Sequence, residues 1–218
     1  RRMLGEANDS GVHIWFPWSG ALFTHFFAHC FIDYAGMGPD DPSAHAVERR
    51  PRVDWWENSR RGVILHRNKA IENPRKVPTL GPDAWGLSAC DGAKGYMVPG
   101  VYPKRIATSD QIAQYDYADF APKDDFGDGT IAPYSAGCAI MFEPRLAISA
   151  LRNYFGLMDK SGNPLVWREP GTGKADAFGF QDSFNLGTGW VAPDCGPPHQ
   201  STLVLATAHA RSGQVWSL

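Results

Sequence analysis

The sequence lacks the features that would assign it to several common classes of protein. No run of apolar residues approaches the roughly 18 needed to cross a bilayer, so we expect no membrane insertion. A formal net charge of −2 argues against a basic face for nucleic acid and against a polybasic membrane patch. We find no internal repeat and no low-complexity tract. The chain starts at Arg1 without an initiator Met or a signal peptide, so we expect it to belong to a longer or processed product.

Cysteine is also scarce. The four cysteines, Cys30, Cys90, Cys138 and Cys195, lie far apart and form no CxxC pair, which argues against a zinc ribbon. Three of the four have small or apolar neighbours, so we predict buried free thiols. One or two disulfides are the alternative.

Aromatic residues, glycine and proline are abundant. The chain has 8 Trp, 12 Phe and 7 Tyr, an aromatic content that a core does not fully require and that sugar-binding clefts commonly use. Its 23 Gly and 17 Pro predict that much of the chain is ordered loop. A neutral, polyol-like ligand fits this composition better than a polyanion.

Hydrophobic periodicity and capping signals predict helices separated by long loops. The apolar run 18–33 indicates a helix that is buried on all sides. Asp54, with Glu57 three residues later, predicts a capping box that starts a second helix, which ends at Asn73. Further helices are predicted over 109–117, 143–155 and 199–211. Loops as long as those between them are usually functional, so we expect an all-α scaffold whose long ordered loops gather at one end.

Residues 176–185, closed by 189–190, form the most informative stretch. Aromatic rings alternate here with small residues, two carboxylates and an amide. Flat rings stack on pyranose faces, while Asp and Asn bind hydroxyl groups. A core segment does not need Asp182 and Asn185, and a solvated loop does not need Phe180. We interpret the stretch as one wall of a carbohydrate site.

His25, His29 and Asp33 recur every four residues and therefore mark one stripe of the helix predicted over 18–33. Two histidines and an acid at this spacing can bind zinc. A buried helix also uses histidine as a hydrogen-bonded core residue, and we favour that role, or a sugar contact, for His25. We expect no metal and no cofactor.

Two short motifs mimic other enzymes. Residues 86–90 approach the nucleophile elbow of a serine esterase around Ser88, but Cys90 replaces the last glycine and no strand is predicted before it. Residues 171–174 mimic a phosphate-binding loop, but Ala175 replaces the hydroxyl residue and the glycine spacing is wrong. The esterase is a distant alternative.

Six motifs follow one another along most of the chain. They are Phe16–His25, Asp54–Arg60, Trp85–Gly92, Asp128–Pro133, Phe142–Pro144 and Phe178–Asn185. Together they resemble the glucoamylase-like domain of bacterial β-1,2-glucanases and cyclic β-1,2-glucan synthases. The resemblance implies an (α/α)6 toroid fold and glycoside hydrolase or transglycosylase chemistry on β-linked glucans.

The resemblance also implies that residues 1–218 are the C-terminal portion of such a catalytic domain. The family's catalytic region includes a preceding helical half, which holds its proposed general acid, so we expect an N-terminal helical segment of the same protein as a partner. A periplasmic or secreted location is expected on the same ground. Family members usually carry an acidic Asp-Gln-Gly turn and a later Glu, where this chain has 197–200 and 206–208.

Glycoside hydrolysis needs two carboxyl groups. Asp182, Asp91 and Asp128 lie in Gly-rich or aromatic loops of the matched motifs, and we predict that they are catalytic, Asp182 first. A cap or turn role is the alternative for each. The predicted substrate-binding residues are Trp18, His25, Trp85, Tyr96, Phe180, Asn185 and Trp190.

The sequence therefore predicts a glycoside hydrolase that acts on an oligo- or polysaccharide of β-linked glucose, with β-1,2-glucan as the expected substrate. The alternatives are a non-catalytic glucan-binding or structural domain that has lost its acids, and a transglycosylase of the same fold.

Overall fold

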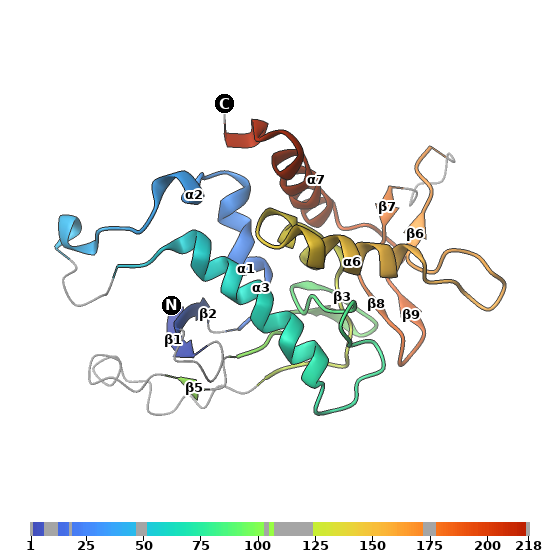
Figure 1. The fold of residues 1–218 in the computed structure, drawn as a ribbon. Coiled ribbons are helices and arrows are strands. Elements are labelled where there is room, and N and C mark those ends of the chain that lie inside the picture. The colour runs from blue at the N-terminus through green and yellow to red at the C-terminus, as the bar shows by residue number, and fades with distance from the viewer. Residues whose placement is uncertain are drawn as a thin grey trace.

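The computed structural model describes residues 2–6, 13–17, 19–46, 52–102, 105–106, 124–171 and 178–216. The longer helices in these ranges are α3 (Trp55–Glu72), α5 (Pro133–Cys138), α6 (Pro144–Phe155) and α7 (Pro197–Ser212). Single helical turns are α1 (Phe23–Phe26), η1 (Phe27–Cys30), α2 (Tyr34–Met37), η2 (Pro42–His45), η3 (Ala139–Met141) and η4 (Gln214–Trp216). Figure 1 shows α3 and α6 crossing the middle of the molecule, with α7 beside α6.

Helix α3 confirms the second predicted helix, and local chemistry explains both its ends. The Asp54 carboxylate accepts a hydrogen bond from the Glu57 backbone N–H at 2.9 Å, as an N-cap residue does. At the other end Asn73 takes the left-handed conformation that commonly closes a helix. The predicted capping box is not completed, because the Glu57 carboxylate pairs with the guanidinium groups of Arg60 and Arg61 instead.

Helices α6 and α7 confirm the predictions over 143–155 and 199–211. Each starts with proline in its first turn, where the missing N–H costs no hydrogen bond. Gly156 follows α6, and Gly213 ends α7 with a positive φ of 66°. The helix predicted over 109–117 lies outside the described residues.

The prediction of one fully buried helix over 18–33 is wrong. The described residues of this segment, 19–33, form only the turns α1 and η1, and Asp33 then accepts a hydrogen bond from the Gly36 N–H and starts a new turn. Such a local side-chain bond competes with the continuation of a helix. Phe27 and Phe31 are 46% and 61% exposed, so the segment is not buried on all sides. With Ile32 and Met37, which are also exposed, they form what we call the Phe27–Phe31 patch.

The prediction of an all-α scaffold is also corrected, because short antiparallel sheets organise the loops. A three-stranded sheet has the order β2 (His13–Pro17), β1 (Arg2–Glu6), β5 (Arg105–Ile106). Three two-stranded sheets pair β3 (Cys90–Gly92) with β4 (Gly95–Met97), β6 (Trp167–Arg168) with β7 (Gly179–Phe180), and β8 (Phe184–Asn185) with β9 (Trp190–Val191). The strands from β6 to β9 lie on the α6 side of the molecule (Figure 1).

The core surrounds α5, whose residues are all buried and which packs against α6 and α7. Gly137 permits the approach of α7, because a Cβ there would lie 2.4 Å from a methyl carbon of Leu203. The loop before β3 is fixed to α6 by the Tyr154 hydroxyl, which donates to the Trp85 carbonyl at 2.6 Å and accepts from its N–H at 3.0 Å. These contacts place β3 next to the core.

All four cysteines are unpaired. Cys30, Cys90 and Cys138 are buried, which confirms the predicted buried thiols, while Cys195 is half-buried. Burial raises the pKa of the Cys30 thiol to about 11. A thiol that stays protonated at neutral pH behaves as a small apolar core residue.

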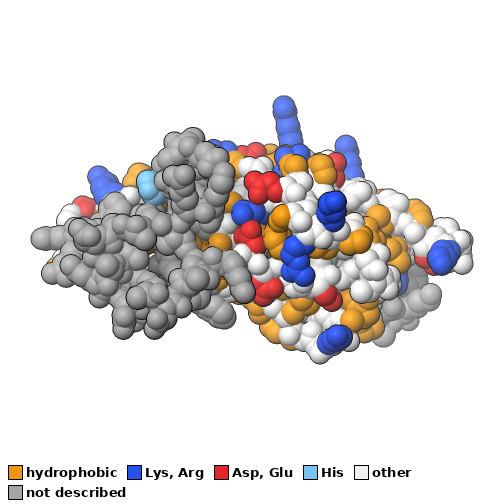
Figure 2. Space-filling view, turned by 90° about the horizontal axis from the view of Figure 1, so that it is seen from below, with side chains coloured by type: hydrophobic (Ala, Val, Ile, Leu, Met, Phe, Trp, Pro, Cys, Tyr) orange, Lys and Arg blue, Asp and Glu red, His pale blue; other side chains and the backbone are white. Residues whose placement is uncertain are grey.

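The described helices include none that is long and apolar enough to cross a membrane. Where the face in Figure 2 is formed by described residues, Lys and Arg alternate with Asp and Glu among apolar side chains. That mixture agrees with the nearly neutral sequence.

Candidate functional site

Asp182, between β7 and β8, connects two distant segments of the chain. Its side chain is 1% exposed, and Oδ2 accepts a hydrogen bond from the Asp91 backbone N–H of β3 at 2.8 Å. Oδ1 lies 2.5 Å from Nδ1 of His199, in the first turn of α7. The Ser183 hydroxyl donates to the Asp91 carbonyl, so adjacent residues of one loop hold both backbone groups of Asp91.

The imidazole of His199 is fixed by two contacts, a hydrogen bond between Nδ1 and Asp182 and a stacked ring on one face. It stacks on Tyr134 of α5 with 4.2 Å between ring centroids and 2° between planes. The Tyr134 hydroxyl donates to the Ala89 carbonyl at 2.7 Å and lies 3.1 Å from the Ser88 hydroxyl, which fixes that ring in turn. A glycine is required next to the pair, because a Cβ on Gly196 would lie 2.3 Å from Oδ1 of Asp182.

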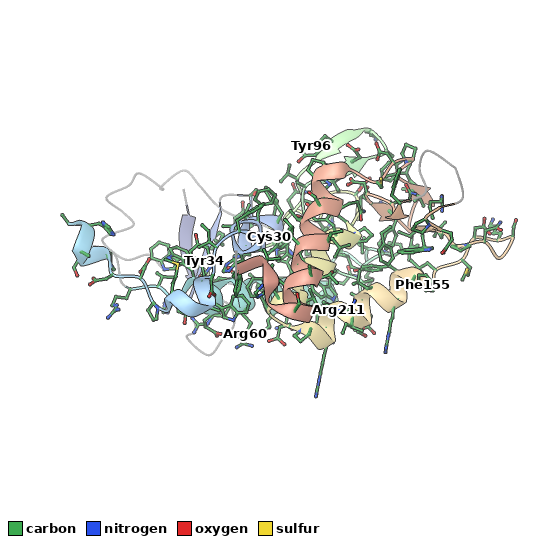
Figure 3. The ribbon with its side chains drawn as sticks, turned by 90° about the horizontal axis from the view of Figure 1, so that it is seen from above. Cys30, Tyr34, Arg60, Tyr96, Phe155 and Arg211 are labelled. Atoms are coloured by element: carbon green, nitrogen blue, oxygen red, sulfur yellow. The ribbon has the colours of Figure 1, made fainter. Side chains whose placement is uncertain are left out.

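Asp91 is the carboxyl of this cluster that is not fully covered. Burial raises its pKa above the ordinary value, the charges of Asp182 and Asp194 add to the rise, and His199 opposes it. A carboxyl group that keeps its proton to higher pH is suited to acid catalysis. Tyr96 pairs with Asp91 across the β3–β4 hairpin and is 65% exposed. In Figure 3 it lies beside one end of α7.

The structure thus brings together two of the three carboxyls that the sequence predicted. It gives Asp182 a covered, supporting position rather than the exposed place in the cleft that we expected, because both its oxygens are occupied by protein groups. Asp91 takes the more accessible position.

Asp128 is an exposed residue whose carboxylate bonds within its own turn, which is the alternative role that we considered for it. Its Oδ1 accepts from the Thr130 N–H at 3.0 Å and from the Thr130 hydroxyl at 2.6 Å. Partial burial raises the pKa of Asp128, but hydrogen bonds from Thr130 and Asn185 outweigh it and leave the pKa below the ordinary value. A carboxyl group stabilised in its ionised form is a poor proton donor.

Asn185 also has a structural role. Its side chain is 1% exposed, its amide donates to the Asp128 carbonyl at 2.9 Å, and its oxygen accepts from the backbone N–H groups of Gly187 and Thr188. These bonds join the turn at 128–130 to the β8–β9 hairpin, and they leave the amide no exposed surface for a sugar.

The predicted aromatic platforms divide between core and surface. Trp85 has no exposed area and offers no ring to a ligand. Phe180 is 8% exposed and packs edge-on against Trp167 with 4.9 Å between ring centroids. Trp190 is half-buried on β9, and Trp18 lies outside the described residues. Tyr96 and Trp190 are therefore the predicted rings that keep accessible surface in the described part of the chain.

His25 is buried and lines a cavity of about 210 Å³ with Ala28, His29, Tyr34 and Trp55. This cavity shares no lining residue with the Asp91, Asp182 and His199 cluster. The stripe that we weighed as a zinc site does not converge: His29 Nε2 lies 2.8 Å from the Ser59 hydroxyl, and Asp33 caps the turn at Gly36.

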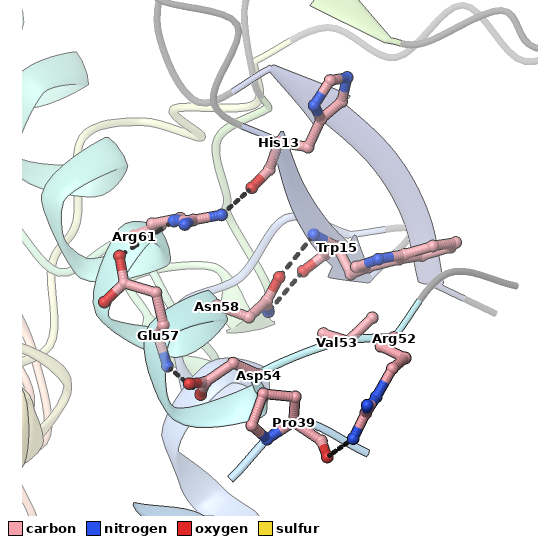
Figure 4. A pocket seen from close by; sticks show the side chains of 9 residues that line it. All are labelled: His13, Trp15, Pro39, Arg52, Val53, Asp54, Glu57, Asn58 and Arg61. Atoms are coloured by element: carbon pink, nitrogen blue, oxygen red, sulfur yellow. Dashed lines mark hydrogen bonds and ion pairs between the residues drawn. The ribbon is translucent and has the colours of Figure 1, made fainter. Parts of the chain in front are cut away.

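A larger cavity, of about 710 Å³, lies between β2 and the start of α3 (Figure 4). Two of its charged groups form an ion pair: Arg61 pairs with Glu57 at 3.0 Å and also donates to the His13 carbonyl at 2.8 Å. The Asn58 amide bonds both backbone groups of Trp15. None of the predicted site residues that the structure describes lines this cavity, so the chemistry that we expected lies elsewhere in the described part of the chain.

Sequence reasoning missed His199, Tyr134 and Gly196. The signal for His199 was present, because it stands in 197–200, where the family's acidic turn is replaced. We treated that replacement as a loss, whereas the structure shows that the new side chain binds Asp182. Tyr134 gave no comparable signal, since its role depends on the ring stacked on it.

The comparisons with known proteins extend over nearly the whole chain. Residues 6–218 match the family model Glycoamylase, whose description is "Putative glucoamylase". The exo beta-1,2-glucooligosaccharide sophorohydrolase (non-reducing end) of Parabacteroides distasonis is 26% identical over 188 residues, which are 86% of this chain and 21% of that protein.

Two solved structures share the fold. The beta-1,2-glucanase from Parabacteroides distasonis has a TM-score of 0.67 at 21% identity, over 98% of this chain and 25% of that chain. The endo-beta-1,2-glucanase from Chitinophaga pinensis, solved with sophorotriose and glucose, has a TM-score of 0.62 at 20% identity, over 100% of this chain and 42% of that chain. The present chain therefore spans about a fifth of the curated relative and less than half of either solved chain.

Proposed function

The chain belongs to the Glycoamylase family, and we propose that it is part of the catalytic domain of a glycoside hydrolase that cleaves β-1,2-linked glucan. The observation that carries the proposal is the bond between the Asp182 carboxylate and the Asp91 backbone, which holds a half-buried carboxyl beside the exposed ring of Tyr96. The substrate is inferred from three similar proteins, all of which are named for activity on β-1,2-linked glucose.

In this proposal Asp91 is the acid, in place of the upstream acid that the family resemblance implies. As the bond between the anomeric carbon and the glycosidic oxygen breaks, Asp91 gives its proton to that oxygen. Its raised pKa keeps the proton available, and activity that needs the protonated form falls as the pH rises through that pKa. Tyr96, and Trp190 if the glucan extends that far, stack on sugar rings.

The rest of the cleft is supplied, in the same proposal, by an N-terminal helical segment that completes an (α/α)6 toroid. The longer relatives support this, since each contains more than twice the length that this chain covers. A polymeric substrate favours a periplasmic or secreted location.

The test uses the full-length protein and measures reducing sugar released from linear β-1,2-glucan, β-1,3-glucan and starch. We expect release from β-1,2-glucan alone. Asp91→Asn should lower kcat at least about 100-fold, the usual contribution of a general acid. Asp159→Asn, in an exposed turn, is the matched control and should keep the wild-type rate. Hydrolysis of starch alone would refute the linkage, and an active Asp91→Asn variant would refute the role of Asp91.

One observation favours a second function, glucan binding without catalysis. Asp182 is covered, and the family's acidic turn and later Glu are replaced by 197–200 and 206–208. Calorimetric binding of β-1,2-glucan by a protein that releases no sugar would support it. Products longer than the substrate would instead indicate a transglycosylase.

A further inference from the structure

We propose that His199 is the proton acceptor of this site, the group that removes a proton from water as the water oxygen bonds to the anomeric carbon. The inference rests on the proposed function and adds to it, because it assigns to an imidazole the part that a second carboxyl plays in other glycosidases.

Asp182 decides which ring nitrogen of His199 carries the hydrogen. An ionised carboxylate oxygen only accepts hydrogen bonds, so at 2.5 Å from Oδ1 the hydrogen belongs to Nδ1. In the neutral imidazole the other nitrogen, Nε2, then has a free lone pair. A buried carboxylate that orients a histidine through Nδ1 and stabilises the imidazolium formed at Nε2 is a recurring arrangement in enzymes.

In the pair formed by His199 and Asp182, the imidazole of His199 is the group that solvent reaches. The side chain of His199 is 20% exposed, whereas that of Asp182 is 1% exposed. Tyr134 covers one face of the ring, and among the described residues no hydrogen bond is recorded at Nε2. A water molecule or a sugar hydroxyl therefore reaches His199 more readily than it reaches Asp182.

Among the described residues, the titratable groups that act directly on this imidazole are Asp182, Asp91 and Tyr134. Asp194, Cys90 and Tyr96 interact with the same cluster through Asp91 or Asp182. The carboxylates stabilise the cation that forms when Nε2 takes a proton. Gly196 has no side chain to separate Asp182 from His199. A Cβ at this position would lie 3.0 Å from Nδ1 of His199.

The step balances with Asp91 as the acid. The water oxygen bonds to the anomeric carbon, and a water proton passes to Nε2. The bond from the anomeric carbon to the glycosidic oxygen breaks, and that oxygen takes the proton of Asp91. His199 ends as imidazolium and Asp91 as carboxylate, and proton exchange with solvent restores both.

The test compares His199→Asn with wild type in the full-length protein on linear β-1,2-glucan. The asparagine amide N–H lies where Nδ1 does and still donates to Asp182, so the buried charge keeps a partner, but no base replaces Nε2. We expect kcat to fall at least about 100-fold, with KM within a few fold of the wild-type value. His45→Gln, an exposed histidine of η2, is the control and should leave the rate unchanged.

Two further variants separate a proton acceptor from a structural residue. His199→Ala should regain activity when imidazole is added, because free imidazole can occupy the space of the ring. Asp182→Asn should lower kcat without unfolding the protein, since its amide would face Nδ1 with a donor and favour the other tautomer. Melting temperatures of all variants show whether each is folded.

The outcomes separate the two proposals. If wild type hydrolyses the glucan and His199→Asn does so at the same rate, the inference is overturned and the proposed function stands. If His199→Ala is folded, inactive and not rescued by imidazole, the inference is overturned as well. If wild type hydrolyses none of the glucans, the proposed function fails, and the inference fails with it.

Discussion

At the scale of single residues, the hydrogen-bond partner of one ring nitrogen determines the tautomer of a histidine and therefore its role. His199 has a carboxylate at Nδ1, whereas His66 of α3 lies 2.9 Å from the Gly20 carbonyl through Nε2. A carbonyl only accepts, so Nε2 of His66 carries the hydrogen, and its buried Nδ1 has no recorded partner among the described residues. Protonation would place a second hydrogen on Nδ1 with nothing to receive it.

His66 should therefore make the fold sensitive to acid. Burial lowers its pKa from 6.5 to about 4, so between these values the unfolded chain takes up a proton that the folded chain does not. This part of the stability is complete above pH 6.5 and is lost as the pH falls towards 4. From pH 7 to pH 4 the loss is on the order of 3 kcal/mol.

The measurement is the urea midpoint of wild type and of His66→Gln from pH 7 to pH 4. Glutamine keeps an N–H donor for the Gly20 carbonyl and does not titrate, so its midpoint should depend less on pH. Equal pH dependence in the two proteins would contradict the assignment.

At the scale of elements, two loops cross with their backbones in direct contact. The Val101 N–H donates to the Gly20 carbonyl at 3.1 Å, and a Cβ on Gly100 would lie 2.2 Å from the Ser19 carbonyl oxygen. The obstacle is backbone, which cannot rotate away as a side-chain tip can. This crossing fixes the segment that leaves β4, and through it the hairpin that carries Asp91 and Tyr96.

Gly100→Ala should lower the free energy of unfolding by about 1 to 3 kcal/mol, the usual cost of overpacking. Gly81→Ala is a close control, because both glycines form isolated β-bridges without a positive φ, and a Cβ on Gly81 meets nothing within 4 Å. It should stay within about 0.5 kcal/mol of wild type. Similar thermal midpoints for the two variants would show that the crossing is loose.

The elements that could be predicted were those whose signals are local. Helices α3, α6 and α7 have their capping, proline and glycine signals within a few residues of each end. Strands of two or three residues show no periodicity, and their pairing depends on turn geometry that the composition does not fix. The prediction over 18–33 was wrong because apolar content alone does not determine how many faces of a segment are covered by other elements.

The same distinction applies to the candidate site. Asp91 and Asp182 were found from motifs, but which of them is exposed depends on a contact between residues 91 positions apart. Trp85 and Asn185 were assigned to sugar because composition does not separate a ring or amide in a cleft from one in the core. His199 differs from the acidic turn of the family at this position. Its role became visible only from its contacts with Asp182 and Tyr134 in the structure.

At the scale of the whole molecule, the Phe27–Phe31 patch is an apolar surface in the described part of the chain. The two phenylalanine rings lie 5.9 Å apart, and Met37 is 68% exposed. Contiguous exposed apolar surface favours association.

The 218-residue chain produced alone should therefore self-associate. Phe27→Lys with Phe31→Lys should shift it towards the monomer in sedimentation experiments, because the added charges repel between copies. Phe155→Lys with Met158→Lys, two residues each 52% exposed at the end of α6, controls for charge alone. A wild-type chain that is monodisperse and melts cooperatively would contradict this expectation.

The separation of the three residues of the site also has a consequence for biosynthesis. Asp91 leaves the ribosome 91 residues before Asp182, and the histidine that completes the cluster follows 17 residues later. Closing loops of this length is slow compared with forming a helix, so the cluster assembles after the local elements. A nascent chain that stops before residue 182 contains the hairpin with Asp91 but neither of the residues, Asp182 and Ser183, that hold it. The proposed site is therefore completed in one late step of synthesis, after the local elements that carry its residues have formed.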